Sequence, residues 1–172
     1  MRNRNMMTRT LLATACIVLA GTAALAQTPK SLGEFKSWTA WSYNGKKGKV
    51  CYVHAIPTSK KPDSLKHGDV SFFIRKSPGE GVANEANFVV GYPFQDNSTV
   101  IVDIDGRKFT MFTREDSAWI LNSAEEPDLV AAMRAGSSMT VTGTSRRGNQ
   151  TTYAYSLSGV TAATNKIITE CN

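Results

Sequence analysis

Short apolar stretches that end at turn signals recur along residues 36–157, and this pattern constrains the fold more than any other feature of the chain. The clearest case spans residues 99–112, where Asp105-Gly106 lies between two alternating stretches and is a strong signal for a two-residue hairpin turn. Because side chains alternate along a strand, this turn also fixes which residues face the core. The predicted core-facing set is Val100, Val102, Phe109 and Met111.

The two aspartates of this hairpin, Asp103 and Asp105, also resemble the start of a calcium-binding loop. Arg107 and Arg114 stand at positions where such a loop needs further oxygen ligands, so we predict no metal site. The hairpin accounts for both residues: Asp105 begins the turn, and Asp103 faces Lys108 across the two strands.

Further stretches of this kind predict an all-β protein, an antiparallel β-sandwich or barrel of about eight or nine short strands. Residues 57–68 are polar and are predicted to form a loop. One helix is predicted, with Ser123 as its cap, Pro127 in its first turn and Gly136 at its end. The other predicted strands lie at residues 36–43, 49–56, 70–75, 87–92, 118–121, 138–144 and 151–157.

Residues 1–26 have the pattern of a cleaved secretory signal peptide. Three arginines stand among the first nine residues, an apolar run covers residues 11–25, and Ala24-Leu25-Ala26 fits a cleavage site. The run has about fifteen residues, whereas a membrane-spanning helix needs roughly 20. We therefore predict export, one domain at residues 27–172, and no transmembrane segment after cleavage.

Two cysteines, Cys51 and Cys171, remain after the predicted cleavage. An even number of cysteines in an exported chain predicts one disulfide, with two free thiols or a metal site as the alternatives. Neither cysteine has a second cysteine at ligand spacing, and His54 stands alone three residues from Cys51, which argues against zinc. We predict no cofactor.

The formal charge of +6 first suggests a nucleic-acid or membrane-surface binder. Three of these charges belong to residues 1–26. In the rest of the sequence, residues 27–76 carry a net charge of +7, whereas residues 77–130 carry −7. Folding either mixes these charges or separates them into two patches of opposite sign. The basic patch would lie around Lys46, Lys47, Lys49, Lys60 and Lys61 and would suit an anionic lipid or polysaccharide. Without a basic stripe bearing stacking aromatics, nucleic acid is not predicted as a partner.

No catalytic motif accompanies the two histidines, His54 and His67. The sequence contains neither the G-x-S-x-G motif of hydrolases nor the H-E-x-x-H motif of metalloproteases. We therefore predict no catalytic residues. An envelope hydrolase or sugar-processing enzyme stays an alternative, and it would require a cleft that holds one histidine beside a carboxylate and a serine.

Several short motifs occur along the chain in a characteristic order. They are Gly48-Lys49-Val50-Cys51-Tyr52-Val53, Gly91-Tyr92-Pro93-Phe94, Val102-Asp103-Ile104-Asp105-Gly106, Ser117-Ala118-Trp119, Ala131-Ala132-Met133-Arg134-Ala135-Gly136 and Thr144-Ser145-Arg146-Arg147-Gly148. Together they resemble the invasion-associated locus B family, exported proteins of α-proteobacteria, over nearly all of residues 35–171. The resemblance implies an immunoglobulin-like β-sandwich, export to the periplasm or cell surface, and in some pathogens a link to host-cell entry. It supplies no catalytic residues.

These observations predict a non-enzymatic exported β-sandwich that binds an envelope or host partner, either a protein or a glycan. The predicted location is the periplasm, with outer-membrane association or secretion left open. A structural or stress-response component of the envelope is a further alternative. The candidate partner surface comprises a turn, a corner and the basic patch: Arg146 and Arg147, Tyr92 and Phe94, and Lys46 and Lys47.

Overall fold

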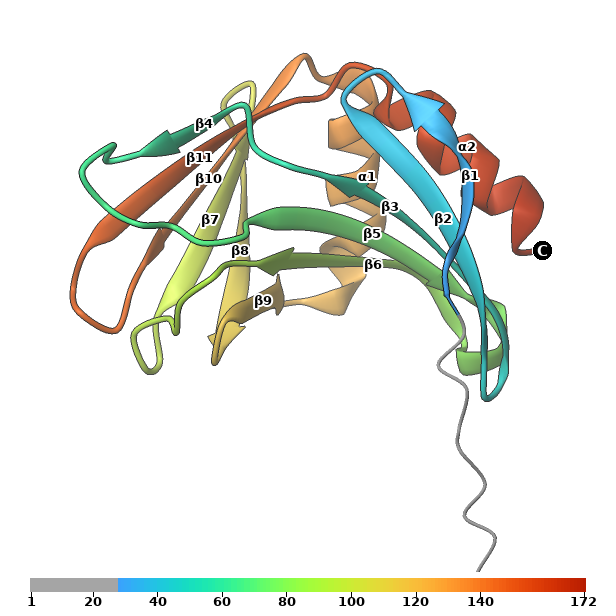
Figure 1. The fold of residues 1–172 in the computed structure, drawn as a ribbon, viewed down its shortest axis with the longest axis horizontal. Coiled ribbons are helices and arrows are strands. Elements are labelled where there is room, and N and C mark those ends of the chain that lie inside the picture. The colour runs from blue at the N-terminus through green and yellow to red at the C-terminus, as the bar shows by residue number, and fades with distance from the viewer. Residues whose placement is uncertain (1–27) are drawn as a thin grey trace, which may run out of the picture.

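The computed structural model describes residues 28–172, so the predicted signal peptide at residues 1–26 lies outside the described residues. Residues 28–172 form eleven strands in one antiparallel sheet and two α-helices (Figure 1). The elements are β1 (Lys30–Phe35), β2 (Trp38–Gly45), β3 (Gly48–Ala55), β4 (Ser59–Lys61), β5 (Ser71–Ser77), β6 (Val82–Val89), β7 (Thr99–Ile104), β8 (Arg107–Arg114), β9 (Ser117–Ile120), α1 (Glu126–Ala135), β10 (Ser138–Thr144), β11 (Gln150–Ser156) and α2 (Val160–Glu170).

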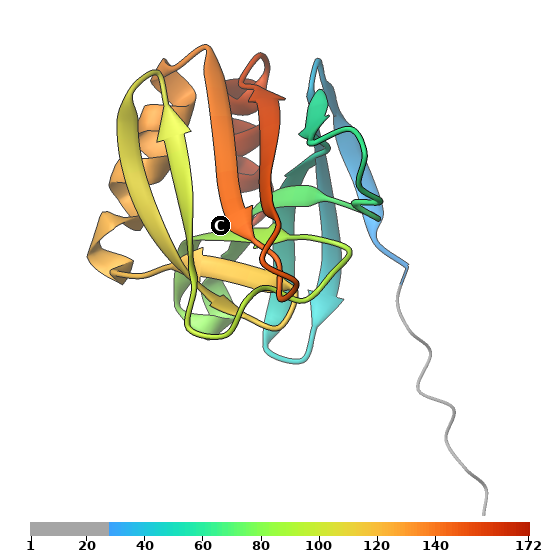
Figure 2. The ribbon, with the colours of Figure 1, turned by 90° about the vertical axis from the view of Figure 1, so that its left-hand side faces the viewer.

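The sheet folds on itself, so that its two halves pack face to face (Figures 1 and 2). Its strand order is β1-β2-β3-β5-β6-β9-β8-β7-β10-β11-β4. Across the core, the ring centroids of Phe88 on β6 and Tyr153 on β11 are 5.6 Å apart. The indole of Trp38 on β2 donates a 3.0 Å hydrogen bond to the backbone oxygen of Ser156 on β11. The predicted all-β antiparallel fold is confirmed, with both layers built from one continuous sheet.

The predicted hairpin is confirmed in its turn, its register and its buried face. Strands β7 and β8 pair with Ile104 opposite Arg107. All four side chains predicted to face the core are buried, because the alternation along each strand places them on the covered side of the sheet. This local pattern was sufficient to predict the pairing.

The aspartates of this hairpin bind backbone groups. The carboxylate of Asp103 accepts a 2.8 Å hydrogen bond from the Gly106 amide, and the register confirms Lys108 as its cross-strand neighbour. Asp105 accepts from the Ser137 amide at 2.8 Å, and this hydrogen bond helps to hold the pKa of the Asp105 carboxyl below its usual value. The turn is thereby tied to the segment that leads into β10.

Two helices are present where one was predicted, so the prediction of a single helix is wrong. The expected helix is α1, but Ser123 does not cap it: Asn122 caps the 3₁₀ turn at Ser123–Glu125 that leads into α1, by accepting a hydrogen bond from the Ala124 amide. The cap residue of α1 itself, Glu125, makes no side-chain capping hydrogen bond. The second helix, α2, is rich in β-branched residues, which favour strands. Its buried residues nevertheless follow helical spacing. They are Val160, Ala163, Thr164 and Ile167.

The disulfide between Cys51 and Cys171 is present and joins β3 to the end of α2. Helix α2 also packs against β1, β2 and β3. Beside the disulfide, Lys49 forms an ion pair with Glu170. The predicted pairing of the two cysteines is thus confirmed.

A buried acid, Glu126, lies where α1 meets β6. Its carboxylate accepts a 3.3 Å hydrogen bond from the Ala86 amide, and the residue is 9% exposed. Burial raises the pKa of this carboxyl to about 7, the hydrogen bond from Ala86 partly opposes that rise, and the negative charge of Glu85 adds to it. The folded protein therefore binds a proton at Glu126 more tightly than the unfolded chain does.

Stability should consequently fall as the pH rises from about 4.5 to about 7, because over this range the folded state still holds a proton that the unfolded chain has already released. Glu126→Gln removes this titration and should leave stability unchanged near pH 4.5. At pH 8 the variant should be more stable by up to about 3 kcal/mol. Urea unfolding at both pH values measures the difference, with Glu125→Gln as the exposed neighbouring control. Equal pH profiles for Glu126→Gln and the unaltered protein would contradict this expectation.

Candidate functional site

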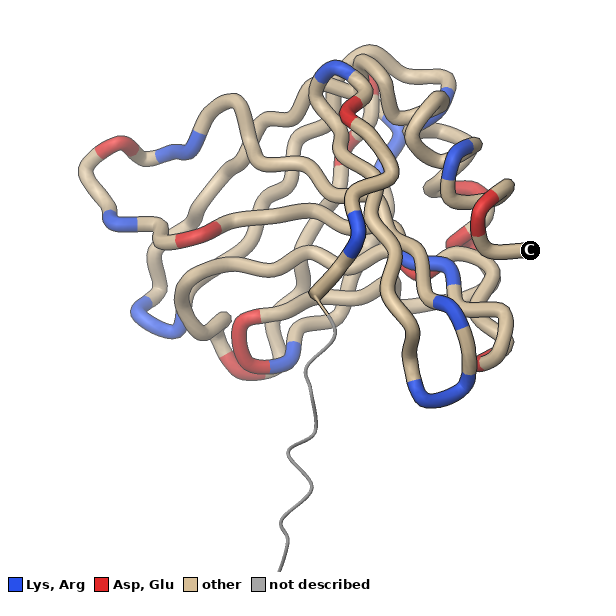
Figure 3. The backbone as a smooth tube through the Cα atoms, turned by 45° about the vertical axis from the view of Figure 1, so that its right-hand side comes forward, with Lys and Arg blue, Asp and Glu red and all other residues tan. Residues whose placement is uncertain are grey.

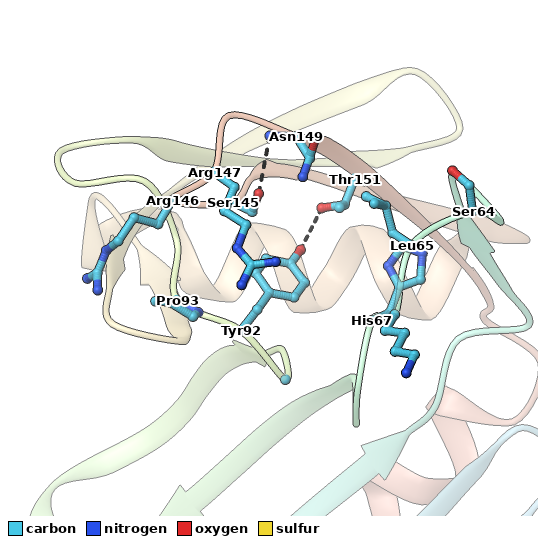
Figure 4. Close-up of a pocket in the computed structure, with 12 residues that line it drawn as sticks. Ser64, Leu65, His67, Tyr92, Pro93, Ser145, Arg146, Arg147, Asn149 and Thr151 are labelled. Atoms are coloured by element: carbon cyan, nitrogen blue, oxygen red, sulfur yellow. Dashed lines mark hydrogen bonds between the residues drawn. The ribbon is translucent and has the colours of Figure 1, made fainter.

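Two of the predicted surfaces meet at one cavity, here called the end cavity (Figure 4). It has a volume of about 540 Å³. The turn between β10 and β11 forms one side, the corner after β6 forms another, and the segment at residues 64–67 forms the third. The lining residues are Ser64, Leu65, Lys66, His67, Gly91, Tyr92, Pro93, Ser145, Arg146, Arg147, Asn149 and Thr151.

Backbone hydrogen bonds hold the turn and the corner together. Within the turn, the Ser145 amide donates to the Asn149 oxygen at 2.9 Å. Gly148 has a φ of +80°, a left-handed conformation that glycine adopts without strain. The Arg146 amide then donates to the Pro93 oxygen at 2.9 Å, which fixes the corner against the turn. The walls of the end cavity are therefore set by main-chain geometry.

The floor of the end cavity is a chain of hydrogen-bonded side chains. Nε2 of His67 lies 2.9 Å from the Pro62 oxygen, which can only accept, so this nitrogen carries a hydrogen. In the neutral ring, Nδ1 then accepts from the Tyr153 hydroxyl, 2.9 Å away. The hydroxyl of Tyr92 lies 2.6 Å from Oγ1 of Thr151 and 2.9 Å from the Tyr153 hydroxyl. Burial raises the pKa of Tyr153, so the floor keeps its phenol neutral.

The rim of the end cavity is cationic. Arg146, Arg147 and Lys66 are exposed, and no carboxylate is among the lining residues within the described chain. Of these three, only Arg146 forms an ion pair within residues 28–172, with its guanidinium 3.4 Å from the carboxylate of Asp96. Within residues 28–172, the side chains of Arg147, Lys66, Asn149 and Ser64 have no intramolecular hydrogen-bond or ion-pair partner. These donors are available to a ligand.

One residue of the candidate surface cannot reach a partner. Phe94 is only 2% exposed, and its ring packs 6.2 Å from that of Phe88, centroid to centroid. The prediction of Phe94 as a contact residue is wrong, because the corner turns its side chain into the core. It supports Tyr92, whose ring lies 5.8 Å away.

Lys46 and Lys47 lie apart from the end cavity, in the turn between β2 and β3 (Figure 3). Figure 1 shows this turn and the β10–β11 turn at opposite ends of the molecule. A Cβ atom on Gly79 would lie 1.7 Å from the Lys47 oxygen, so the 3₁₀ turn at Pro78–Glu80 packs closely on this hairpin. The six candidate residues therefore belong to two separate regions.

The oppositely charged segments of the sequence mix on folding. Arg75 from the basic segment donates to Glu85 at 2.8 Å and to Glu80 at 2.6 Å, both from the acidic segment. These ion pairs neutralise charge locally, so folding mixes the two charged segments here and does not separate them into two patches. The end cavity is an exception, because its lining contains three cationic residues and no acid within the described chain.

The two histidines have different surroundings, and neither has a carboxylate partner in the described structure. His54 lies outside the end cavity, with Nε2 3.0 Å from the Ser71 hydroxyl, and burial lowers its pKa. His67 shares the end cavity with Ser64 and Ser145, but Tyr153 and Pro62 occupy both of its ring nitrogens. The arrangement that a hydrolase would need is not assembled at either histidine.

Two further findings concern residues 28–172 as a whole. They contain no group of three or more His, Cys, Asp and Glu side chains placed to hold a metal ion. None of the helices in this part of the chain combines the length and the apolar character needed to cross a membrane.

Comparison with known proteins finds the same family that the sequence motifs resemble. The sequence model of one family, described as "Invasion associated locus B (IalB) protein", matches residues 38–168. The chain belongs to the IalB family. The matched stretch of this IalB-family chain includes the whole end cavity. No curated protein matches the chain.

A solved structure supports the fold of this IalB-family chain. The crystal structure of invasion associated protein B from Bartonella henselae matches it with a TM-score of 0.59 at 18% sequence identity. The match covers 82% of this chain and 97% of that chain. At this identity the likeness establishes a shared fold.

Proposed function

We propose that this IalB-family protein is an exported, non-enzymatic envelope protein that binds an envelope or host partner through the end cavity. The observation that carries the proposal is a concave site in which two cationic side chains without partners in the described chain, Arg147 and Lys66, stand over a fixed, hydrogen-bonded floor. Such a site offers fixed walls and free donors to a ligand, which limits the cost of ordering the protein on binding.

Export rests on three observations. The first 26 residues follow the signal-peptide pattern, the protein contains a disulfide, and its family is described as invasion associated. Disulfides persist in the periplasm and on cell surfaces, so we place the protein in one of these compartments. In a pathogen, a partner bound at the end cavity would provide a route to a role in host-cell entry.

The bonding of His67 favours binding over hydrolysis. A general base must lie within hydrogen-bond reach of the nucleophile whose proton it removes, but the ring nitrogens of His67 face the buried Tyr153 hydroxyl and the Pro62 oxygen, and neither bonds a serine of the described chain. The end cavity also lacks the carboxylate that orients a catalytic histidine, as far as the described residues show. We therefore favour a binding site over an active site here.

Removing the two arginines of the rim should weaken binding to the cell envelope. We expect purified Arg146→Ala/Arg147→Ala protein to bind isolated envelopes at least tenfold more weakly, because a hydrogen bond to a charged group contributes about 1.5–3 kcal/mol. Lys46→Ala/Lys47→Ala is the matched control, since it removes the same charge at the other end of the molecule. Sedimentation with envelopes over a range of protein concentrations measures both affinities.

Two outcomes would contradict the proposal. One is equal binding by the arginine variant and the unaltered protein. The other is a larger loss in the lysine variant, which would place the partner surface at the β2–β3 turn. Circular dichroism of both variants shows whether they keep the fold, as expected for substitutions in exposed turns.

A further inference from the structure

We infer that the end cavity binds an acidic saccharide, with its carboxylate at Arg147 and Lys66 and its sugar ring against Tyr92 and Pro93. This inference rests on the proposed function, because it names the chemistry of the ligand for the same cavity. Charge, size and the donors that line the cavity each support it.

Charge favours an anionic ligand. Arg147 and Lys66 carry positive charge without an ion-pair partner in the described chain, whereas Arg146 is paired with Asp96. The guanidinium of Arg147 can hold a carboxylate through two parallel hydrogen bonds. A neutral ligand would form no ion pair with Arg147 or Lys66.

Size favours a compact ring. A volume of about 540 Å³ lies within the range of roughly 300–1,000 Å³ that is typical of sites for small molecules. An extended peptide usually adds to a free sheet edge or occupies a long groove. Next to the end cavity, β4 already covers the edge of β11, where Thr152 pairs with Lys61. The edge strand at this place is β4 itself, and its three residues, Ser59–Lys61, offer only a short edge to an extended peptide.

The residues that line the end cavity offer both an apolar surface and hydrogen-bonding groups, and a sugar ring with its hydroxyls can use both. Tyr92 is half-buried and Pro93 is exposed, so together they offer an apolar surface to the face of a ring. The amide of Asn149 and the hydroxyl of Ser64 are exposed and can each donate to and accept from sugar hydroxyls. Figure 4 shows these groups around the same cavity as Arg147.

The test compares four probes with purified protein by calorimetry and NMR titration. They are a glucuronate-containing disaccharide, the same disaccharide with its carboxylate reduced to an alcohol, inorganic phosphate and an acidic hexapeptide. We expect the glucuronate disaccharide to bind at least tenfold more tightly than the reduced one, with an affinity that falls as salt is raised. Amide signals of Lys66 and Asn149 should shift during the titration.

Variants locate the binding. Arg147→Ala should weaken binding of the glucuronate disaccharide at least tenfold, whereas Lys46→Ala should leave it within twofold of the unaltered protein. Equal binding of the acidic and reduced disaccharides, tighter binding of the peptide or of phosphate, or an Arg147→Ala affinity equal to the unaltered one would each overturn the inference. If no disaccharide binds but envelope binding still depends on Arg146 and Arg147, the saccharide is wrong and the proposed function stands. If envelope binding is also insensitive to both arginines, the proposed function fails as well.

Discussion

Replacing both cysteines, Cys51→Ser/Cys171→Ser, is expected to lower the free energy of unfolding by about 4 kcal/mol. The disulfide closes a loop with a sequence separation of 120, so it removes many conformations from the unfolded chain. For a domain of this size, such a loss corresponds to a decrease in Tm of roughly 10–20 °C. The effect should be large because the disulfide also fixes α2 against β3.

Thermal unfolding of the serine variant and of the unaltered protein, each with and without reductant, measures this contribution. Reductant should lower the Tm of the unaltered protein toward that of the variant and leave the variant unchanged. A variant that melts within about 3 °C of the oxidised protein would contradict the expectation, since it would assign the stability of α2 to packing alone.

Gly159→Ala is expected to destabilise the protein by about 3 kcal/mol or more. Gly159 precedes α2 with a φ of +96°, which costs other residues about 1 kcal/mol or more. A Cβ atom there would also lie 1.9 Å from the Phe35 oxygen, so β1 or α2 has to move. Overpacking of this kind adds about 1–3 kcal/mol to the backbone strain.

Gly148→Ala separates these two causes. Gly148 has a comparable φ of +80°, but a Cβ atom there meets nothing within 4 Å. Urea unfolding of both variants should therefore give a loss of about 1 kcal/mol for Gly148→Ala and a clearly larger one for Gly159→Ala. Equal losses would show that the contact with Phe35 costs little.

Local patterns predicted the parts of the fold that depend on neighbouring residues. The β7–β8 hairpin follows from Asp105-Gly106, because a two-residue turn and strict alternation together fix the pairing register. Helix α1 follows from Pro127 at its start and Gly136 at its end. In both cases the signals lie within a few residues of the element that they specify.

Long-range packing decided the parts that the sequence pattern missed. Helix α2 contains β-branched residues with low helix propensity, and it forms because its buried face covers β1, β2 and β3. Strand β4 lies within the predicted loop at residues 57–68, and its pairing with β11 supplies the order that its own polar sequence does not indicate. The prediction of loop throughout residues 57–68 is therefore wrong at Ser59–Lys61.

The end cavity was predicted only in part for the same reason. Arg146, Arg147 and Tyr92 were identified from a turn and a corner, which are local features. Lys66 and His67 were not assigned to this surface, because they reach it only when β4 pairs with β11 and carries the following segment to the turn. A local sequence pattern cannot predict a contact between residues that lie about 80 positions apart in the chain.

Site-specific photocrosslinking in intact cells tests the central claim, that a partner occupies the end cavity, most directly. A photoreactive residue at Asn149, on the rim of the end cavity, is compared with one at Lys46, in the exposed turn at the other end of the molecule. We predict a discrete crosslinked product from position 149 that is lost when Arg147→Ala is added, and none from position 46. A product from position 46 alone, a product from position 149 that persists with Arg147→Ala, or no product from either position would contradict the claim.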